Sequence, residues 1–233
     1  MEFGYLDRNT ERVRERILDA ERRAGRGEGE VLFLAAVKYA DEEEIRYLHR
    51  SLGVSDLGEN RVQQLLSHYE AMEDRESIRW HFIGTLQTNK VKYIIDKVCM
   101  IHSVDSLKLA AEIDKQAAKR GLCMDILVEI NSGEEENKSG LFPSEVEEFC
   151  GQLAQFSHIR HRGFMTMAPK CEKKEDYIKY FQQTYAQVLD IWTKKLHNID
   201  RPLISMGMSE SFEEAILCGS DIVRIGRSLF VKE

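Results

Sequence analysis

The sequence lacks the features of several classes of protein. Its 233 residues include five cysteines but no C-x-x-C pair, and their odd number suits a reducing compartment. No apolar run approaches the length of a membrane span, and charged residues occupy the N-terminus where a signal peptide needs an apolar core. The formal net charge of −7 argues against nucleic-acid or anionic-membrane partners. We therefore expect a cytoplasmic protein that binds neither.

Two motifs of cofactor and metal chemistry are also missing. There is no G-x-G-x-x-G dinucleotide fingerprint and no H-E-x-x-H zinc motif. His158 and His161 lie three residues apart on an expected strand, which places them on opposite faces. We therefore expect no metal site.

What the chain does contain is a regular alternation of short apolar runs with longer amphipathic segments. The expected strands are Val31–Tyr39, Val54–Leu57, Ile78–Gly84, Val98–Val104, Met124–Asn131, Ile159–Met167, Pro202–Met206 and Asp221–Ile225. The expected helices are Asp7–Ala24, Asp41–Ser51, Arg61–Glu73, Gln87–Lys97, Ser106–Arg120, Pro143–Phe156, Lys174–His197 and Glu210–Leu217.

Eight strands that alternate with helices along the chain predict a closed parallel α/β barrel of the TIM type, (β/α)8. The first helix, before the first strand, is expected to cover the barrel. An open, doubly wound sheet is the alternative, but it would usually have fewer strands and a glycine-rich fingerprint. We expect residues 1–233 to form this single domain.

The first apolar run ends on a lysine. Side chains alternate along a strand, so Lys38 shares a face with Leu32, Leu34 and Ala36. Active sites of barrel enzymes lie at the carboxyl ends of the strands, where a lysine amine could react with an aldehyde. The alternative is a lysine that extends from the sheet end into water.

Two loops near the C-terminus have the composition of phosphate sites. Gly207-Met208-Ser209 follows the seventh strand and Gly226-Arg227-Ser228 follows the eighth, the two positions where barrels often hold a phosphate. The alternative is that Gly207 and Gly226 only permit tight turns and that Ser209 is an ordinary helix cap.

Arg224 occupies the face of the eighth strand opposite to Val223 and Ile225. Such a guanidinium needs a partner, either a carboxylate such as Glu59 or Glu129 or the ring nitrogen of a cofactor. Together with the Lys38 amine and the two loops, it suits pyridoxal 5′-phosphate (PLP) held as a Schiff base on Lys38.

One segment carries a resemblance to a known family. Residues 80–90, Trp-His-Phe-Ile-Gly-Thr-Leu-Gln-Thr-Asn-Lys, resemble the signature of the pyridoxal phosphate homeostasis proteins, single-barrel relatives of the alanine racemase N-terminal domain. Shorter motifs follow in the family's order: Ala36-Val37-Lys38, Gly58-Glu59-Asn60, Lys138-Ser139-Gly140, Gly163–Pro169, Met206–Ser209 and Val223–Gly226.

The resemblance implies a monomeric barrel that acts in intracellular PLP homeostasis by buffering or delivering the cofactor, without established turnover. Apo PLP-dependent enzymes would be the acceptors. The implied cofactor contacts are a Schiff base on Lys38, Asn60 beside the ring, Arg224 at the ring nitrogen, and Ser209 with the backbone of Gly226 and Arg227 around the phosphate.

The chain departs from the family pattern at four places. Val37 replaces a small hydroxyl residue, Arg227 replaces Thr or Ser, and Ser211 replaces Asp. The C-terminus, residues 230–233, lacks the usual Gly and Arg.

The main rival function is a PLP-dependent amino-acid racemase. Racemisation needs an acid or base on each face of the bound substrate, and alanine racemases take the second from an additional domain. Tyr39, His81 and Lys90 are candidates for that second group here, but each has an ordinary structural role as an alternative. We therefore expect no catalytic residue.

Overall fold

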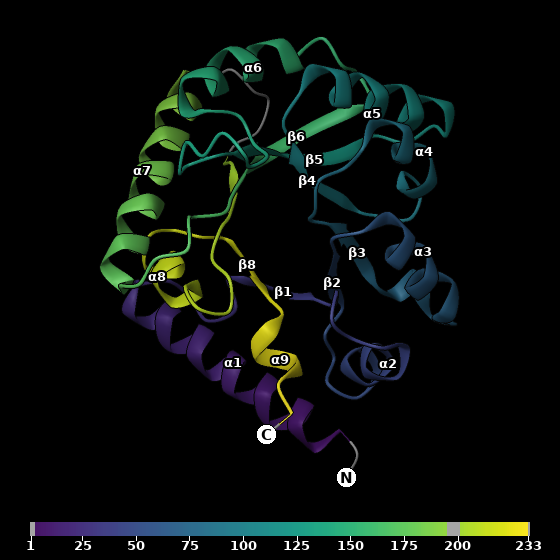
Figure 1. Ribbon diagram of the computed structural model, residues 1–233, viewed down its shortest axis with the longest axis vertical. Coiled ribbons are helices and arrows are strands. Elements are labelled where there is room, and N and C mark those ends of the chain that lie inside the picture. Colours follow the sequence, from purple (N-terminus) through teal and green to yellow (C-terminus); the bar gives the residue numbers. More distant parts are fainter. Residues whose placement is uncertain (1–2, 195–200, 233) are drawn as a thin grey trace.

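The computed structural model describes residues 3–194 and 201–232, and its centre is a closed barrel of eight parallel strands (Figure 1). Each strand pairs with its neighbours in sequence, and β8 closes the ring by pairing with β1. The strands are β1 Leu32–Ala36, β2 Asp56–Glu59, β3 Arg79–Phe82, β4 Met100–Val104, β5 Met124–Ile130, β6 Ile159–Thr166, β7 Leu203–Ser205 and β8 Ile222–Ile225. The predicted fold class is confirmed.

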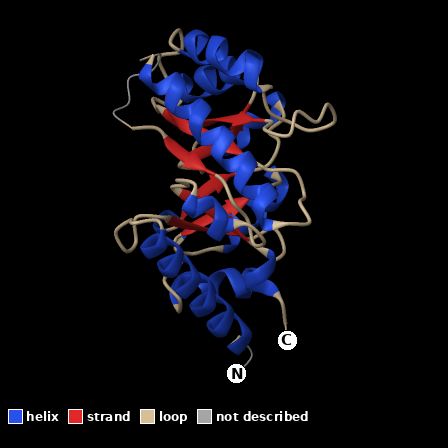
Figure 2. Ribbon diagram, turned by 90° about the vertical axis from the view of Figure 1, so that its left-hand side faces the viewer, coloured by secondary structure: helices blue, strands red, loops and turns tan. Residues whose placement is uncertain are grey.

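Helices surround the strands, as Figures 1 and 2 show from two sides. They are α1 Gly4–Arg23, α2 Glu42–Arg50, α3 Val62–Ala71, α4 Val91–Ile94, α5 Leu107–Lys119, α6 Val146–Leu153, α7 Lys174–Thr193, α8 Phe212–Leu217 and α9 Arg227–Phe230. In the described ranges, no helix is both long and apolar enough to cross a membrane.

Several expected boundaries were wrong. The segment expected as a helix at 87–97 is a 3₁₀ turn, Thr88–Lys90, followed by the single turn of α4, and a similar turn, Pro143–Glu145, precedes α6. Helix α9 was not predicted, because four residues are too few for a periodic pattern. The expected end of the long helix at His197 lies outside the described residues.

Side chains on the two faces of the strands pack into separate apolar clusters. The interior of the barrel holds Leu34, Ala36, Ile83, Met100, Leu127, Met165 and Ile222. The opposite faces of the strands pack against the helices and form the larger core. Leu34 and Ala36 point inward, so the face predicted to include Lys38 is the interior face.

Helix α1 lies against α8 and α9, with Val13, Ile17 and Ala20 buried on its inner side. Asn9 Nδ2 donates hydrogen bonds to the carbonyl oxygens of Leu229 and Val231 (3.0 Å each), which fixes the C-terminal segment on α1. The first helix therefore covers the part of the barrel that carries the last strand.

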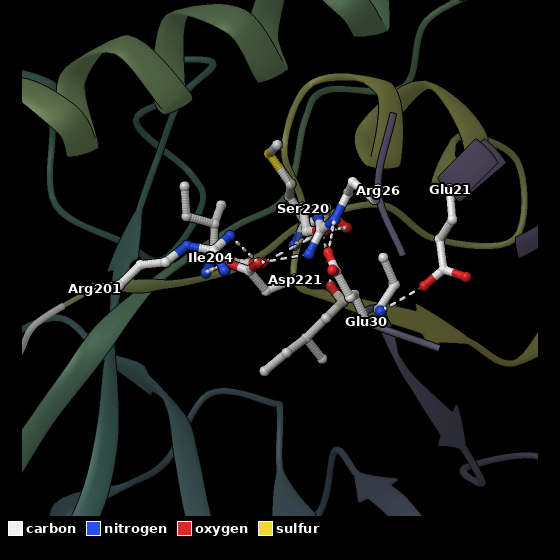
Figure 3. A network of polar contacts seen from close by, with 10 residues as sticks. Glu21, Arg26, Glu30, Arg201, Ile204, Ser220 and Asp221 are labelled. Atoms are coloured by element: carbon white, nitrogen blue, oxygen red, sulfur yellow. Dashed lines mark hydrogen bonds and ion pairs between the residues drawn. The ribbon is translucent and has the colours of Figure 1, made fainter. Parts of the chain in front are cut away.

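A polar cluster fastens β8 to its neighbours at their amino-terminal end (Figure 3). The buried Asp221 carboxylate accepts the backbone N–H of Ile204 at 2.9 Å and lies 3.0 Å from Arg26 Nη2 and 2.6 Å from Arg201 Nη2. Arg26 Nη1 also donates to the carbonyl oxygen of Ser220 at 2.6 Å. These bonds tie the loop before β1 to β7 and β8, where the ring closes.

Candidate functional site

A cavity of about 370 Å³ opens at the carboxyl ends of β1, β7 and β8. Its lining includes five of the six predicted cofactor residues: Lys38, Ser209, Arg224, Gly226 and Arg227. Residues separated by almost 190 positions in the sequence thus meet at one site because β8 pairs with β1. Barrels of this fold bind their ligands at this end, where the carboxyl ends of the strands lie.

Lys38 lies two residues beyond the end of β1, at the mouth of the cavity. The backbone N–H of Val37 still bonds to the carbonyl oxygen of Gly58 (3.0 Å), so the chain remains attached to β2 up to the residue before the lysine. The Lys38 side chain is exposed, and its Nζ lies 4.8 Å from the centre of the Tyr39 ring. The amine is therefore accessible to a ligand.

Arg224 forms the inner wall of the cavity and is only 4% exposed. Its Nη1 donates to the carbonyl oxygen (2.8 Å) and hydroxyl (2.6 Å) of Ser205, and its Nη2 donates to the carbonyl oxygen of Thr166 (2.9 Å). Burial lowers the pKa of Arg224 to about 10, although the charge of Glu129 acts in the opposite direction. The guanidinium therefore stays charged at neutral pH.

The two carboxylates considered as one alternative for the partner of Arg224 form their hydrogen bonds elsewhere. Glu59 Oε1 lies 2.6 Å from His68 Nδ1, and Glu129 Oε1 accepts the hydroxyl of Ser139 at 2.9 Å. Backbone carbonyl oxygens and the Ser205 hydroxyl replace them. Such partners depend on the register between β6, β7 and β8, which no sequence motif reveals.

The glycine positions of the two loops leave no room for a side chain. A Cβ at Gly226 would lie 2.9 Å from the carbonyl oxygen of Ala36, and one at Gly207, where φ is +92°, would lie 2.5 Å from the Ala215 Cβ. Ser209 Oγ accepts the backbone N–H of Ser228 at 3.3 Å, which joins the two loops. The structure thus brings the two predicted phosphate loops together as one wall.

Two of the departures from the family pattern have a structural role. The exposed Arg227 pairs with Glu210 (2.5 Å), so its side chain extends along the rim. Ser211 Oγ accepts the backbone N–H of Met208 at 3.3 Å and closes the turn before α8. Ser228 Oγ is buried without a hydrogen-bond partner among the described residues, so it is an available donor beside this wall.

Asn60 is the one predicted cofactor residue that does not line the cavity. Asn60 follows β2, and its backbone lies so close to Gly84 that a Cβ atom added at Gly84 would collide with it. The Asn60 Oδ1 atom is buried and has no partner among the described residues. Asn60 thus sits at a strand exit with an unused polar atom.

Sequence reasoning missed part of the lining. The lining also includes further cations and apolar side chains from the loops after β5, β6 and β7 and from α7, among them Lys138, Lys170, Met167, Met208 and Tyr177. The side chains of long loops carry no periodic signal. The loop that carries Lys138 is held by the Ser139–Glu129 bond and by a bond from the Gly140 N–H to Asp105 Oδ2 (3.3 Å).

Of the candidates for a second acid or base, only Tyr39 lies in the cavity lining; His81 and Lys90 do not. His81 is 3% exposed and is hydrogen-bonded in the barrel interior. The described part of the chain also contains no cluster of three or more His, Cys, Asp or Glu residues that could hold a metal ion.

Comparisons with known proteins agree with this geometry. The family model "Alanine racemase, N-terminal domain" matches residues 9–233. The pyridoxal phosphate homeostasis protein of Aquifex aeolicus is 44% identical over 219 residues, 94% of each chain. A Bifidobacterium adolescentis crystal structure of a protein described as unknown has a TM-score of 0.91, with 32% identity over 97% of this chain and 94% of that one.

PipY of Synechococcus elongatus, solved with PLP bound, has a TM-score of 0.80 and 27% identity, and the match covers 91% of this chain and 99% of that one. The matches thus extend over nearly the whole length of both the sequence and the fold. This chain belongs to the pyridoxal phosphate homeostasis protein family, within the larger group of alanine racemase N-terminal domains.

Proposed function

We propose that this chain binds PLP in the cavity at the carboxyl ends of β1, β7 and β8, as a Schiff base on Lys38. The observation that carries the proposal is the convergence in one cavity of an accessible amine, a buried guanidinium and two glycine loops. The names of the relatives and the PLP-bound PipY structure support the same cofactor.

Each lining group fits one part of PLP. The Lys38 Nζ would condense with the aldehyde carbon, forming a C=N bond with loss of water. Ser209 and the backbone N–H groups of Gly226 and Arg227 would bind the phosphate, to which Ser228 can add its unused hydroxyl. Asn60 does not line the cavity, but the family resemblance implies a position beside the ring, and its unpartnered Oδ1 atom would be the group that contacts the ring.

Arg224 would face the ring nitrogen. A guanidinium can only donate hydrogen bonds, so its partner must be an unprotonated nitrogen. Bound PLP supplies a reactive aldehyde and an electron-accepting ring, and an unprotonated ring nitrogen weakens the second property. The site is therefore better suited to binding PLP through its aldehyde than to catalysing the conversion of amino acids.

This chemistry supports a role in PLP homeostasis. The chain would act as a monomer in the cytoplasm, where it holds the cofactor reversibly and releases it to apo PLP-dependent enzymes. A racemase would need a second acid or base in the cavity, and of the three candidates Tyr39 alone lines it.

Titration of the purified protein with PLP tests the proposal. We expect a Schiff-base absorption band that Lys38→Ala removes. Lys170→Ala, which deletes another amine in the same lining, is the matched control and should keep the band. A band that survives Lys38→Ala overturns the assignment of the lysine. Loss of optical activity from an L-amino acid incubated with the loaded protein would favour the racemase instead.

A further inference from the structure

A chain of buried polar side chains crosses the barrel interior from Arg224 toward the amino-terminal end. Ser205 Oγ lies 2.6 Å from Arg224 Nη1 and 3.3 Å from His102 Nδ1. His102 Nε2 lies 3.0 Å from His81 Nδ1, and His81 Nε2 lies 3.1 Å from Asp56 Oδ1. The five residues come from five strands, and each is at most 6% exposed.

The two ends of this chain determine where its protons lie. Arg224 can only donate, and an ionised carboxylate can only accept. Burial raises the pKa of Asp56, but hydrogen bonds from His81 and Arg79, together with the charge of Arg79, hold it below its ordinary value. Asp56 is therefore an acceptor, and His81 Nε2 carries a proton. A neutral His81 then accepts from His102 Nε2–H, and His102 Nδ1 accepts the Ser205 hydroxyl proton.

If the hydrogen bonds of this chain were donated in the opposite direction, the buried hydroxyl proton of Ser205 would have no acceptor. If His81 carried two protons, it would donate to His102 Nε2, and His102 Nδ1–H would donate to Ser205. The Ser205 oxygen would then accept from both His102 and Arg224, and its own proton would face no acceptor among the described residues. A buried hydroxyl in that state is unfavourable. Burial also lowers the pKa of His102 well below its ordinary value, and the charge of Arg224 adds to this effect.

Three other ionisable groups face this chain. Arg79 binds Asp56 at one end, and the charge of Glu129 acts on Arg224 at the other. Cys99 Sγ lies 3.4 Å from His81 Nε2, but burial raises the pKa of this thiol to about 12, so it stays neutral. None of them offers the His81 Nε2–H a stronger acceptor than the Asp56 carboxylate.

We propose that Ser205, His102 and His81 are positioning residues: they form a one-directional hydrogen-bond chain, from Arg224 to Asp56, that orients the guanidinium. With Nη1 committed to Ser205 and Nη2 to Thr166, the orientation of the guanidinium plane at the cavity wall is fixed. Its role toward the ring nitrogen rests on the proposed function, whereas the direction of the chain does not.

Long-range ¹H–¹⁵N correlation spectra of the histidine side chains, recorded without PLP, test the direction. We expect His81 and His102 each as the neutral tautomer with the proton on Nε2. A proton on His102 Nδ1, or a doubly protonated His81 at neutral pH, overturns the inference. Because no PLP is present, this result is independent of whether the proposed function holds.

Ser205→Ala tests the link to Arg224, with Ser103→Ala as the matched control. Ser103 is also buried in a barrel strand, but its hydroxyl has no partner among the described residues. We expect Ser205→Ala to relax the single tautomer of His102, to lower PLP affinity roughly threefold to tenfold and to shift the pH midpoint of the absorption band. Ser103→Ala should change none of these. Equal behaviour of the two variants overturns the positioning role, whereas a wild-type protein that does not bind PLP overturns the proposed function.

Discussion

Arg224 is a buried cation at the inner wall of the site. The alternation of side chains along β8 placed Arg224 in the interior correctly, because Val223 and Ile225 mark the outer face. Its partners could not be predicted, because the Thr166 and Ser205 carbonyl oxygens become neighbours only through strand pairing. The alternation of residues in one sequence predicts which face of a strand a side chain occupies. It does not predict which residues of the neighbouring strands that side chain contacts.

Glu129 makes the stability of the fold depend on pH. Burial raises the pKa of Glu129 to about 7, and the charge of Asp105 adds to this increase. The hydrogen bond from Ser139 and the charge of Arg224 lower the pKa, but by less. The ordinary carboxyl pKa in the unfolded chain is lower, so the folded state binds more protons between about pH 4.5 and pH 7. The contribution of Glu129 to stability is therefore lost as the pH rises through this window.

Glu129→Gln should remove this dependence. We expect the variant to be more stable than the wild type above pH 7, by at most about 3 kcal/mol, with little difference near pH 4. Denaturant unfolding at several pH values measures the effect. Glu136→Gln, in the exposed part of the following loop, is the control and should leave the pH profile unchanged. A Glu129→Gln variant with the wild-type pH profile would contradict the account.

At the scale of elements, the longer helices and the order of the strands were predictable from periodicity, and the short segments were not. Helix α2 begins as the sequence suggests, because Asp41 and Glu44 form a capping box there. The segment at 87–97 has an apolar stripe but only one α-helical turn. Neither α9 nor the 3₁₀ turns extend far enough to show a helical period.

The loop after β8 depends on Gly226. Gly226→Ala would place a Cβ 2.9 Å from the Ala36 carbonyl oxygen and push the loop away from β1. We expect PLP affinity to fall and the free energy of unfolding to decrease by about 1–3 kcal/mol. Parallel denaturation and PLP titration measure both changes.

Gly151→Ala provides a matched control in a helix. A Cβ at Gly151 in α6 would meet nothing within 4 Å, so this variant should gain about 0.5–1 kcal/mol from helix propensity and bind PLP normally. If the two variants had the same effect, the close approach of Gly226 to β1 would not be a determinant of the site.

At the scale of the whole molecule, the count of eight strands alternating with helices was enough to predict the closed barrel. Closure also depends on contacts between distant positions that no motif marks, such as the Asp221 cluster with Arg26 and Arg201. The same limit applies to the site. Lys38 and the two glycine loops were predicted from local sequence, whereas the lining contributed by the loops after β5 and β6 was not.

Asp221→Asn should weaken the closure of the barrel. The buried carboxylate pairs with Arg26 and Arg201, and the amide would leave these cations without a full counter-charge. We expect a loss of about 2–4 kcal/mol in thermal or denaturant unfolding, with the PLP cavity preserved at the opposite end. Glu30→Gln, which alters the exposed end of the same cluster, should cost less than about 1 kcal/mol. Equal losses in the two variants would contradict the role of Asp221.

The most direct test of the account is borohydride reduction of the PLP-loaded protein followed by peptide mass mapping. Reduction converts a Schiff base into a stable secondary amine, so the lysine that holds the cofactor keeps its mass label. We predict a single pyridoxyl label on the peptide that contains Lys38, and its loss in Lys38→Ala but not in Lys170→Ala. A label mainly on another lysine, or no label on a protein that has bound PLP, would contradict the central claim.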